Sequence, residues 1–213
     1  TTGGIAGRNV SENSGSGSTV EDCYNIGDVT GAVSGSGDVG GVVGHNNNSN
    51  VYTSTVKNCY NTGKVTGTGK LGGAVGRIET GDVSDCYYLN TSAAEGIGSV
   101  PDDTEVTNVE SKTAEEFASG EVAWLLQSGQ AEPVWGQQNL GGTDSLPELT
   151  SKKAYSVIQV TFKISKEDSQ PYTVYTTPGS TVTFPADPEA PEGRAFAGWY
   201  SGGTKYESGA TFT

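Results

Sequence analysis

The chain has 213 residues and a formal net charge of −13, from 25 acidic and 12 basic side chains. A surface of this sign repels phosphate, which excludes nucleic acid as a partner, and no apolar run reaches the roughly 18 residues that a membrane span needs. Hydrophobic residues make up 33 % of the chain, and glycines number 32. This composition is too poor in large apolar side chains for one large core, and it favours a thin, elongated β architecture.

Charge and glycine content divide the chain into three parts. Residues 1–100 carry 5 basic and 9 acidic side chains and 21 of the glycines. Residues 101–150 carry 1 basic and 10 acidic side chains, and residues 151–213 carry 6 of each. These steps predict domain boundaries near 100 and 150. Because the chain opens inside a repeat pattern, we expect it to be part of a longer parent polypeptide.

A Cys-Tyr motif recurs three times in the first hundred residues. It reads DCYNIGDVTG at 22–31, NCYNTGKVTG at 58–67 and, in a degenerate copy, DCYYLN at 85–90. Each copy is short, rich in β-branched residues and bounded by Gly or Asn, as strands and tight corners require. Asn25 and Asn61 stand at equivalent corners and are expected to stack as a ladder.

A Gly-Gly motif stands between these copies and reads GGIAG at 3–7, GGVVG at 40–44 and GGAVG at 72–76. Paired glycines let the backbone turn or approach closely where a Cβ would clash. No copy could bury an apolar face alone, so the array is stable only when its copies stack. We therefore expect stacked parallel strands around one thin core, with these side chains pointing inward: Val20, Val29, Val42, Val43, Val56, Val65, Ala74, Val75 and Val83.

The alternation of the two motifs resembles the GLUG repeat of bacterial surface and secreted proteins, over roughly residues 1–98. This resemblance implies a right-handed parallel β-helix, or solenoid, that serves as a stalk or adhesin module. Such repeats also occur beside catalytic domains such as peptidases. The resemblance carries no catalytic residues to transfer to this chain.

The three cysteines, Cys23, Cys59 and Cys86, occupy equivalent repeat positions. Equivalence predicts an inward column of structural thiols, because a free cysteine packs as a small apolar group. A disulfide between neighbours and a metal site are the alternatives, although the chain has no CxxC motif and a single histidine. That histidine, His45, lies in an Asn-rich loop and is expected to be solvated.

Side chains alternate across a strand, so an inward cysteine turns the following tyrosine outward. Tyr24, Tyr60 and Tyr87 are therefore expected to form an exposed aromatic stripe. Stacking of the rings on one another is the simpler interpretation, and a platform for sugar rings is the functional one. These three tyrosines are the candidate ligand-binding residues, with a host protein or glycan as the expected partner.

No catalytic residue, cofactor or metal site is predicted. The adjacent carboxylates Glu21-Asp22, Asp102-Asp103 and Glu115-Glu116 point in different directions on a strand or a helix. None of these pairs is expected to flank a glycosidic bond as a catalytic pair. No Asp-x-Asp-x-Asp-Gly run offers the converging oxygens that calcium needs.

The acidic middle segment is expected to cap the repeats. Thr113 and Glu116 make a capping box, which predicts one or two short helices between about 113 and 128, divided at Gly120. An open solenoid end exposes strand edges and needs a cover. Three large side chains are predicted to bury that end: Trp124, Leu125 and Trp135. The alternatives for this segment are an acidic surface that attracts a basic partner and an aromatic ligand site.

The last part of the chain, residues 151–213, predicts a small β domain. Strands are expected over three ranges: 157–164, 172–177 and 180–184. A Pro-rich loop and the motif GRAFAGWY at 193–200 follow. This order resembles the Listeria–Bacteroides repeat, of the internalin B-repeat type, over about residues 155–213. The resemblance implies a β-grasp-like fold with Phe196 and Trp199 in its core, and a closing strand that is either truncated or divergent.

These features together predict a non-catalytic extracellular segment of a larger bacterial surface protein, which spaces or presents binding modules. An accessory region of a secreted peptidase or carbohydrate-active enzyme is the alternative. A polysaccharide lyase ranks last, because that chemistry needs a basic side chain in a cleft and the basic residues of the repeats are scattered.

Overall fold

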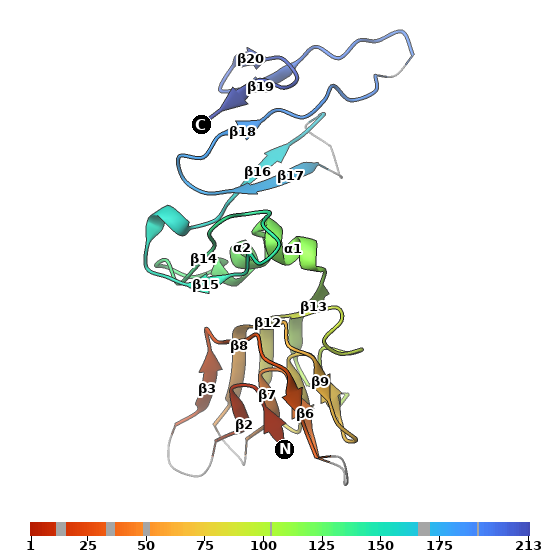
Figure 1. Cartoon of the computed structure of the whole chain (residues 1–213), viewed down its shortest axis with the longest axis vertical. Coiled ribbons are helices and arrows are strands. Elements are labelled where there is room, and N and C mark those ends of the chain that lie inside the picture. The colour runs from red at the N-terminus through yellow and green to blue at the C-terminus, as the bar shows by residue number, and fades with distance from the viewer. Residues whose placement is uncertain (12–15, 33–36, 49–51, 103, 166–170, 191) are drawn as a thin grey trace.

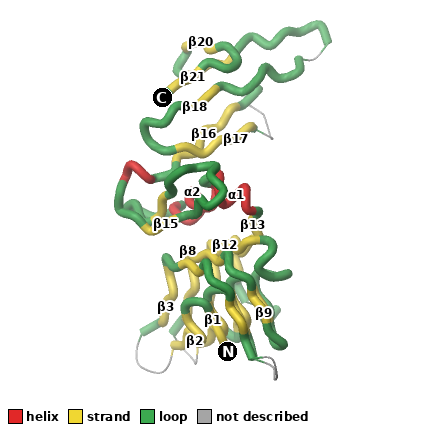
Figure 2. The backbone as a smooth tube through the Cα atoms, viewed as in Figure 1, coloured by secondary structure: helices red, strands yellow, loops and turns green. Residues whose placement is uncertain are grey.

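The computed structural model of the chain describes residues 1–11, 16–32, 37–48, 52–102, 104–165, 171–190 and 192–213. The protein is mainly β, with parallel sheets in the N-terminal repeats and antiparallel pairs in the C-terminal part. The repeats lie at one end of an elongated molecule, two helices lie in the middle, and the C-terminal strands lie at the other end (Figure 1). Long loops join the C-terminal strands (Figure 2). Neither helix among the described residues combines the length and apolar character needed to cross a membrane.

The first two copies of the repeat add strands to four parallel sheets, and the third copy adds strands to three of them. The first sheet contains β1 (Thr2–Gly3), β6 (Val39–Gly40) and β10 (Leu71–Gly72). The second contains β2 (Ala6–Ser11), β7 (Val43–Asn48) and β11 (Val75–Ile78). The third contains β3 (Ser18–Glu21), β4 (Tyr24–Asn25), β8 (Ser54–Asn61), β12 (Asp82–Leu89) and β13 (Val106–Lys112). The fourth contains β5 (Val29–Thr30) and β9 (Val65–Thr66).

The strand register reproduces the alignment of the repeats in the sequence. Equivalent residues are direct partners in neighbouring strands: Gly3, Gly40 and Gly72; Val20, Val56 and Val83; Cys59 and Cys86. A Cβ on Gly40 would overlap the carbonyl oxygen of Val43, and a Cβ on Gly41 would overlap the side chain of Asn61. Both positions of the Gly-Gly motif therefore require glycine because the neighbouring chain comes so close.

The residue before each cysteine has a left-handed backbone conformation. The φ angle is 51° at Asp22, 50° at Asn58 and 49° at Asp85. Asn and Asp tolerate this region better than other residues with a side chain. The Asp or Asn that opens each Cys-Tyr motif is therefore a backbone requirement.

β13 continues the third sheet beyond the third copy. Asn108 has the same left-handed conformation, with a φ of 52°, and the next residue, Val109, is the direct partner of Cys86. β13 is thus a degenerate fourth copy of the strand, supplied by the acidic middle segment. β13 covers the edge of β12, which is this end of the repeat stack. Trp124, Leu125 and Trp135 therefore do not bury that end, and the prediction that they do is wrong.

The predicted inward residues pack in two clusters rather than one. Most of them form the first cluster with Cys59 and Cys86, and Val20 packs against it half-buried. Val29 and Val65 pack instead with Val39. The prediction of a single core is wrong because the fourth sheet faces the first sheet, not the valines of the second and third.

The middle of the molecule, here called the cap (residues 113–150), begins with two short helices. α1 (Ala114–Ser119) starts at the predicted capping box, in which the Glu116 amide donates to Thr113 Oγ1 over 3.1 Å and the Thr113 amide donates to Glu116 Oε2 over 2.6 Å. Gly120, with a φ of 99°, divides α1 from α2 (Glu121–Gln127), as predicted. A short antiparallel pair, β14 (Trp135–Gly136) and β15 (Glu148–Leu149), completes the cap.

The C-terminal part is built from antiparallel pairs after a 3-10 turn, η1 (Lys153–Tyr155). β16 (Ile158–Phe162) pairs with β17 (Tyr172–Thr176), β18 (Val182–Thr183) pairs with β21 (Thr211–Phe212), and β19 (Trp199–Ser201) pairs with β20 (Thr204–Tyr206). Trp199 is buried and Phe196 packs against the same apolar cluster, which confirms their prediction as core residues. The β-grasp arrangement itself stays a prediction.

Candidate functional site

The three predicted ligand-binding tyrosines lie in one column across the third sheet. Tyr24 and Tyr87 are the direct partners of Tyr60 on its two sides. The rings of Tyr24 and Tyr60 stack with their centroids 5.2 Å apart and their planes at 7°. The cysteines pack in one apolar cluster and the buried tyrosines in another. The predicted alternation of thiol and ring, and the stacking of Tyr24 on Tyr60, are therefore confirmed.

The predicted exposure of this tyrosine column is wrong. Tyr60 and Tyr87 are only 0 % and 2 % exposed, and Tyr24 alone keeps a substantial exposed fraction, 38 %. The reason is the cap, whose Phe117 and Trp135 pack in the same cluster as the two buried rings. Binding of sugar by the column stays a prediction, but only Tyr24 is open to a ligand in this structure.

Specific contacts fasten the cap to the tyrosine column. The Trp135 ring lies 5.8 Å from the ring of Tyr60 and 6.2 Å from that of Tyr24. The Tyr60 hydroxyl donates to the carbonyl oxygen of Pro147 over 2.7 Å. Burial raises the pKa of Tyr60, and the nearby Tyr24 and Glu148 raise it further. Because Trp135 contacts the first two copies, the cap lies along the side of the stack.

The three cysteines form the predicted column of free thiols. Each thiol donates to a carbonyl oxygen two residues earlier, at 3.0 Å for Cys23, 3.0 Å for Cys59 and 3.2 Å for Cys86. The hydrogen bond with Cys59, followed by burial, raises the pKa of Cys23. A thiol that holds its proton is a poor nucleophile. Cys59 and Cys86 are buried in an apolar cluster, where a thiol packs as a small apolar group.

His45 is not solvated, and that prediction is wrong. Its side chain is 12 % exposed, and its Nε2 lies 3.2 Å from Glu79 Oε2. The reason is that β7 pairs with β11 on one side and β2 on the other, so this residue belongs to a sheet and not to a loop. Within the described ranges, no group of three or more His, Cys, Asp or Glu side chains converges as metal ligands do. Asp103, of the Asp102-Asp103 pair, lies outside the described residues.

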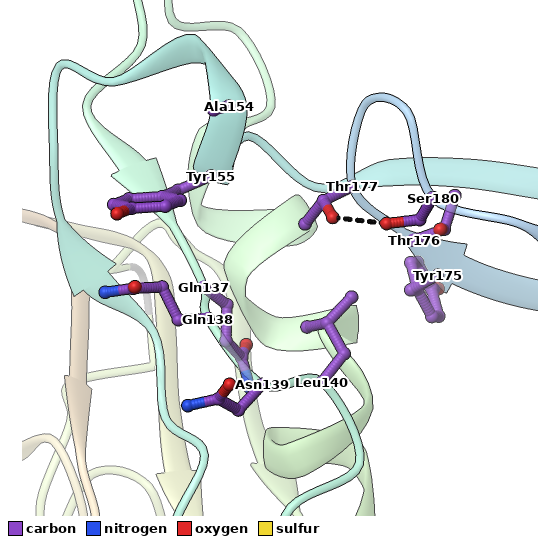
Figure 3. A pocket seen from close by; sticks show the side chains of 10 residues that line it. All are labelled: Gln137, Gln138, Asn139, Leu140, Ala154, Tyr155, Tyr175, Thr176, Thr177 and Ser180. Atoms are coloured by element: carbon purple, nitrogen blue, oxygen red, sulfur yellow. Dashed lines mark hydrogen bonds between the residues drawn. The ribbon is translucent and has the colours of Figure 1, made fainter.

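A pocket of about 460 Å³ opens between the cap and the C-terminal part. Its wall on the cap side is the loop after β14, and its other walls are η1 and the end of β17 with the turn that follows. Figure 3 shows the Tyr155 ring on one side and Thr177, Ser180 and Tyr175 on the other. We call this the junction pocket. Its lining residues are Gln137, Gln138, Asn139, Leu140, Ala154, Tyr155, Tyr175, Thr176, Thr177 and Ser180.

One family profile, described as the GLUG motif, matches residues 35–66. The matched stretch contains one Gly-Gly motif and one Cys-Tyr motif, and it ends with β9. The GLUG motif is found in bacterial extracellular proteins. No curated protein and no solved structure matches the chain. The likeness of residues 155–213 to the internalin B-repeat stays a prediction.

Sequence reasoning missed the junction pocket entirely. Its residues come from the cap and the C-terminal part, and no periodicity links Gln138 to Tyr155 or Tyr175. One signal was present: Gln137, Gln138 and Asn139 form an uncharged polar run in a segment that carries 10 acidic side chains. Such a run is a reason to look for a neutral binding surface.

Proposed function

We propose that this chain is a non-catalytic extracellular segment of a larger bacterial surface protein, and that it holds binding modules at a fixed spacing. The match to the GLUG motif, which is found in bacterial extracellular proteins, supports the location. We interpret the four in-register parallel sheets as the faces of a right-handed β-solenoid. In such a stack each copy contacts only its neighbours, so length grows with copy number without a larger core.

The observation that carries the spacer role is that the cap packs against both of its neighbours. On the repeat side, Trp135 reaches the tyrosine column, and Lys112 Nζ of β13 lies 2.9 Å from Glu121 Oε1 of α2. On the other side, the ring of Trp124 lies 6.0 Å from that of Tyr175. The two interfaces meet in one short helix, so bending at either interface would break aromatic contacts.

The cap is also linked to the C-terminal part through the backbone. The Gln137 amide donates to the carbonyl oxygen of Tyr155 over 2.9 Å. Gly120 packs so closely between Leu140 and Val157 that a Cβ there would lie 2.9 Å and 3.1 Å from their side chains. Close packing of this kind resists hinge motion, because interiors packed at crystal density do not deform continuously.

Small-angle X-ray scattering on the whole chain tests the spacer role. The wild-type curve is expected to fit a single particle with the elongated shape that Figure 1 shows. Trp124→Ala removes the ring contact with Tyr175 and is expected to broaden the distribution of dimensions. Tyr200→Ala, which removes an exposed ring of β19, is the matched control. A wild-type chain as flexible as the Trp124 variant contradicts the proposal.

An activity screen tests the non-catalytic part of the proposal. The purified chain is incubated with peptide and polysaccharide libraries, and products are followed by mass spectrometry. No turnover above that of a heat-denatured sample is expected. Reproducible cleavage that disappears on unfolding would overturn the proposal and favour a carbohydrate-active enzyme or a peptidase.

A further inference from the structure

We propose that the junction pocket binds a neutral sugar, with the Tyr155 ring and the amides of Gln138 and Asn139 as its principal contacts. The inference does not require the spacer role, because it depends on the lining of one pocket only. The volume of about 460 Å³ lies within the range of about 300–1,000 Å³ that small-molecule sites occupy.

The lining of the junction pocket is uncharged. None of the ten lining residues is Asp, Glu, Lys or Arg, although the chain carries 25 acidic and 12 basic side chains. Charged groups lie behind the lining, among them Glu148 and Lys152: Glu148 Oε1 accepts from Gln138 Nε2 over 2.7 Å, and Lys152 Nζ lies 5.1 Å from the Tyr155 ring centroid. Each of these two contacts a lining side chain. A phosphate or carboxylate ligand would find no cationic side chain in the lining, so the pocket favours a neutral one.

The polar groups of the lining include amides and hydroxyls. Amides both donate and accept hydrogen bonds, and so do the hydroxyls of Thr and Ser. Thr177 Oγ1 and Ser180 Oγ already lie 2.8 Å apart, with either one able to donate (Figure 3). A sugar ring carries several hydroxyls of the same mixed character, and each needs a partner when it leaves water. The lining supplies such partners on two sides of the pocket.

Two aromatic rings belong to the lining of the pocket. Tyr155 and Tyr175 are half-buried and lie on opposite sides of the pocket in Figure 3. An aromatic face offers a large, rigid apolar surface, which suits the C–H faces of a pyranose. Trp124 and the side chain of Gln159 hold Tyr175 in place, the latter donating to the Tyr175 hydroxyl over 3.3 Å. A preorganised wall reduces the entropy lost on binding.

The buried side chain of Gln137 forms the wall behind these groups. Gln137 is wholly buried; its Nε2 donates to the carbonyl oxygen of Phe117 over 2.8 Å and to Ser145 Oγ over 2.9 Å. These hydrogen bonds hold the inner wall of the pocket against α1 and Ser145, which keeps the lining preorganised.

A glycan array probed with the whole chain, followed by saturation-transfer NMR with the sugars that bind, tests the proposal. Neutral hexoses or N-acetylhexosamines are expected among the binders. Two variants remove contacts without strain: Tyr155→Ala shortens a half-buried side chain, and Asn139→Gly removes the amide where φ is 53°, a conformation that glycine adopts freely. Each is expected to weaken binding by about two- to tenfold, as the loss of one aromatic or hydrogen-bonding contact does.

Controls separate the junction pocket from other surfaces. Tyr200→Ala removes an exposed ring of β19 that does not belong to this lining and is expected to leave binding unchanged. Tyr24→Ala tests the open end of the tyrosine column. Circular dichroism and the melting temperature report whether each variant is folded. The proposal is overturned if no neutral sugar binds, if binders are only anionic glycans or peptides, or if binding survives both pocket variants. None of these outcomes bears on the scattering test of the spacer role.

Discussion

Trp135 Nε1 donates a hydrogen bond to Asp22 Oδ1 over 3.0 Å, joining two residues that stand 113 positions apart in the chain. Gln130 Nε2 donates to the same oxygen over 2.9 Å. Asp22 is also the left-handed residue that opens the first Cys-Tyr motif. One side chain therefore shapes the backbone of the first copy and anchors the cap to it.

Replacing Trp135 tests this anchor. The ring is fully buried, so Trp135→Ala is expected to lower the free energy of unfolding by about 3–5 kcal/mol. Trp135→Phe keeps an aromatic ring but loses the hydrogen bond to Asp22, and about 1–2 kcal/mol is expected from that loss. Chemical denaturation measures both values. A Trp135→Ala chain as stable as a Tyr200→Ala control, which should stay within about 0.5 kcal/mol of wild type, would contradict the anchoring role.

The second glycine of the Gly-Gly motif makes a separate prediction. A Cβ on Gly41 would overlap both the carbonyl oxygen of Gly73 and the side chain of Asn61. Gly41→Ala is therefore expected to destabilise the repeats by about 1–3 kcal/mol through overpacking. Gly37→Ala is the control, because a Cβ there meets nothing within 4 Å. Equal melting temperatures for the two variants would show that the space beside Asn61 is not limiting.

The register of the repeats was predictable because the residues of each motif are required by local packing and backbone conformation. The second glycine makes room for a corner asparagine, and Asn25 Nδ2 donates to Asn61 Oδ1 over 2.7 Å, as the ladder prediction requires. The degenerate third copy follows the same geometry: Tyr88 is the partner of Asn61 and takes the same space against Gly73. The ladder ends there because a tyrosine ring replaces the amide.

The covering of the tyrosine column could not be predicted in the same way. Alternation along a strand places the side chains of Tyr60 and Cys59 on opposite faces of the sheet. It does not predict which residues pack against the Tyr60 ring. That depends on Phe117 and Trp135, which are distant in sequence and follow no repeat. β13 was missed for a related reason, since only Asn108 matches the Cys-Tyr motif and Val109 stands in place of the cysteine.

Lys112 links β13 to the cap, and its removal tests that link. Its Nζ lies 2.9 Å from Glu121 Oε1 and 3.2 Å from Glu110 Oε2. Burial lowers the pKa of Lys112, but the hydrogen bonds and charges of these two carboxylates outweigh burial, so the pKa is raised and the amine stays charged. Lys112→Met is expected to destabilise the chain by about 1–3 kcal/mol, because hydrogen bonds to charged groups are lost.

A double-mutant cycle with Glu121→Gln separates this pair from general packing. A coupling free energy of about 0.5–3 kcal/mol between the two substitutions is expected for contacting residues. If the two effects simply add, the effect of Lys112→Met does not act through Glu121, and the link between β13 and α2 is not electrostatic.

Alkaline pH should loosen the cap through Tyr60. Its pKa is raised above the ordinary value of 10.0 by burial, so the folded state keeps the phenolic proton after the unfolded state has lost it. Stability is then fully present below about pH 10 and falls above it, by about 1.4 kcal/mol per pH unit for this one group. Unfolding free energies measured between pH 8 and about pH 11 check the slope. Tyr60→Phe, which has no proton to lose and also loses the hydrogen bond to Pro147, should be less stable at pH 8 but have a shallower slope. If Tyr60→Phe leaves the slope of unfolding free energy against pH unchanged, other groups dominate alkaline unfolding, and the cap does not bury the Tyr60 hydroxyl.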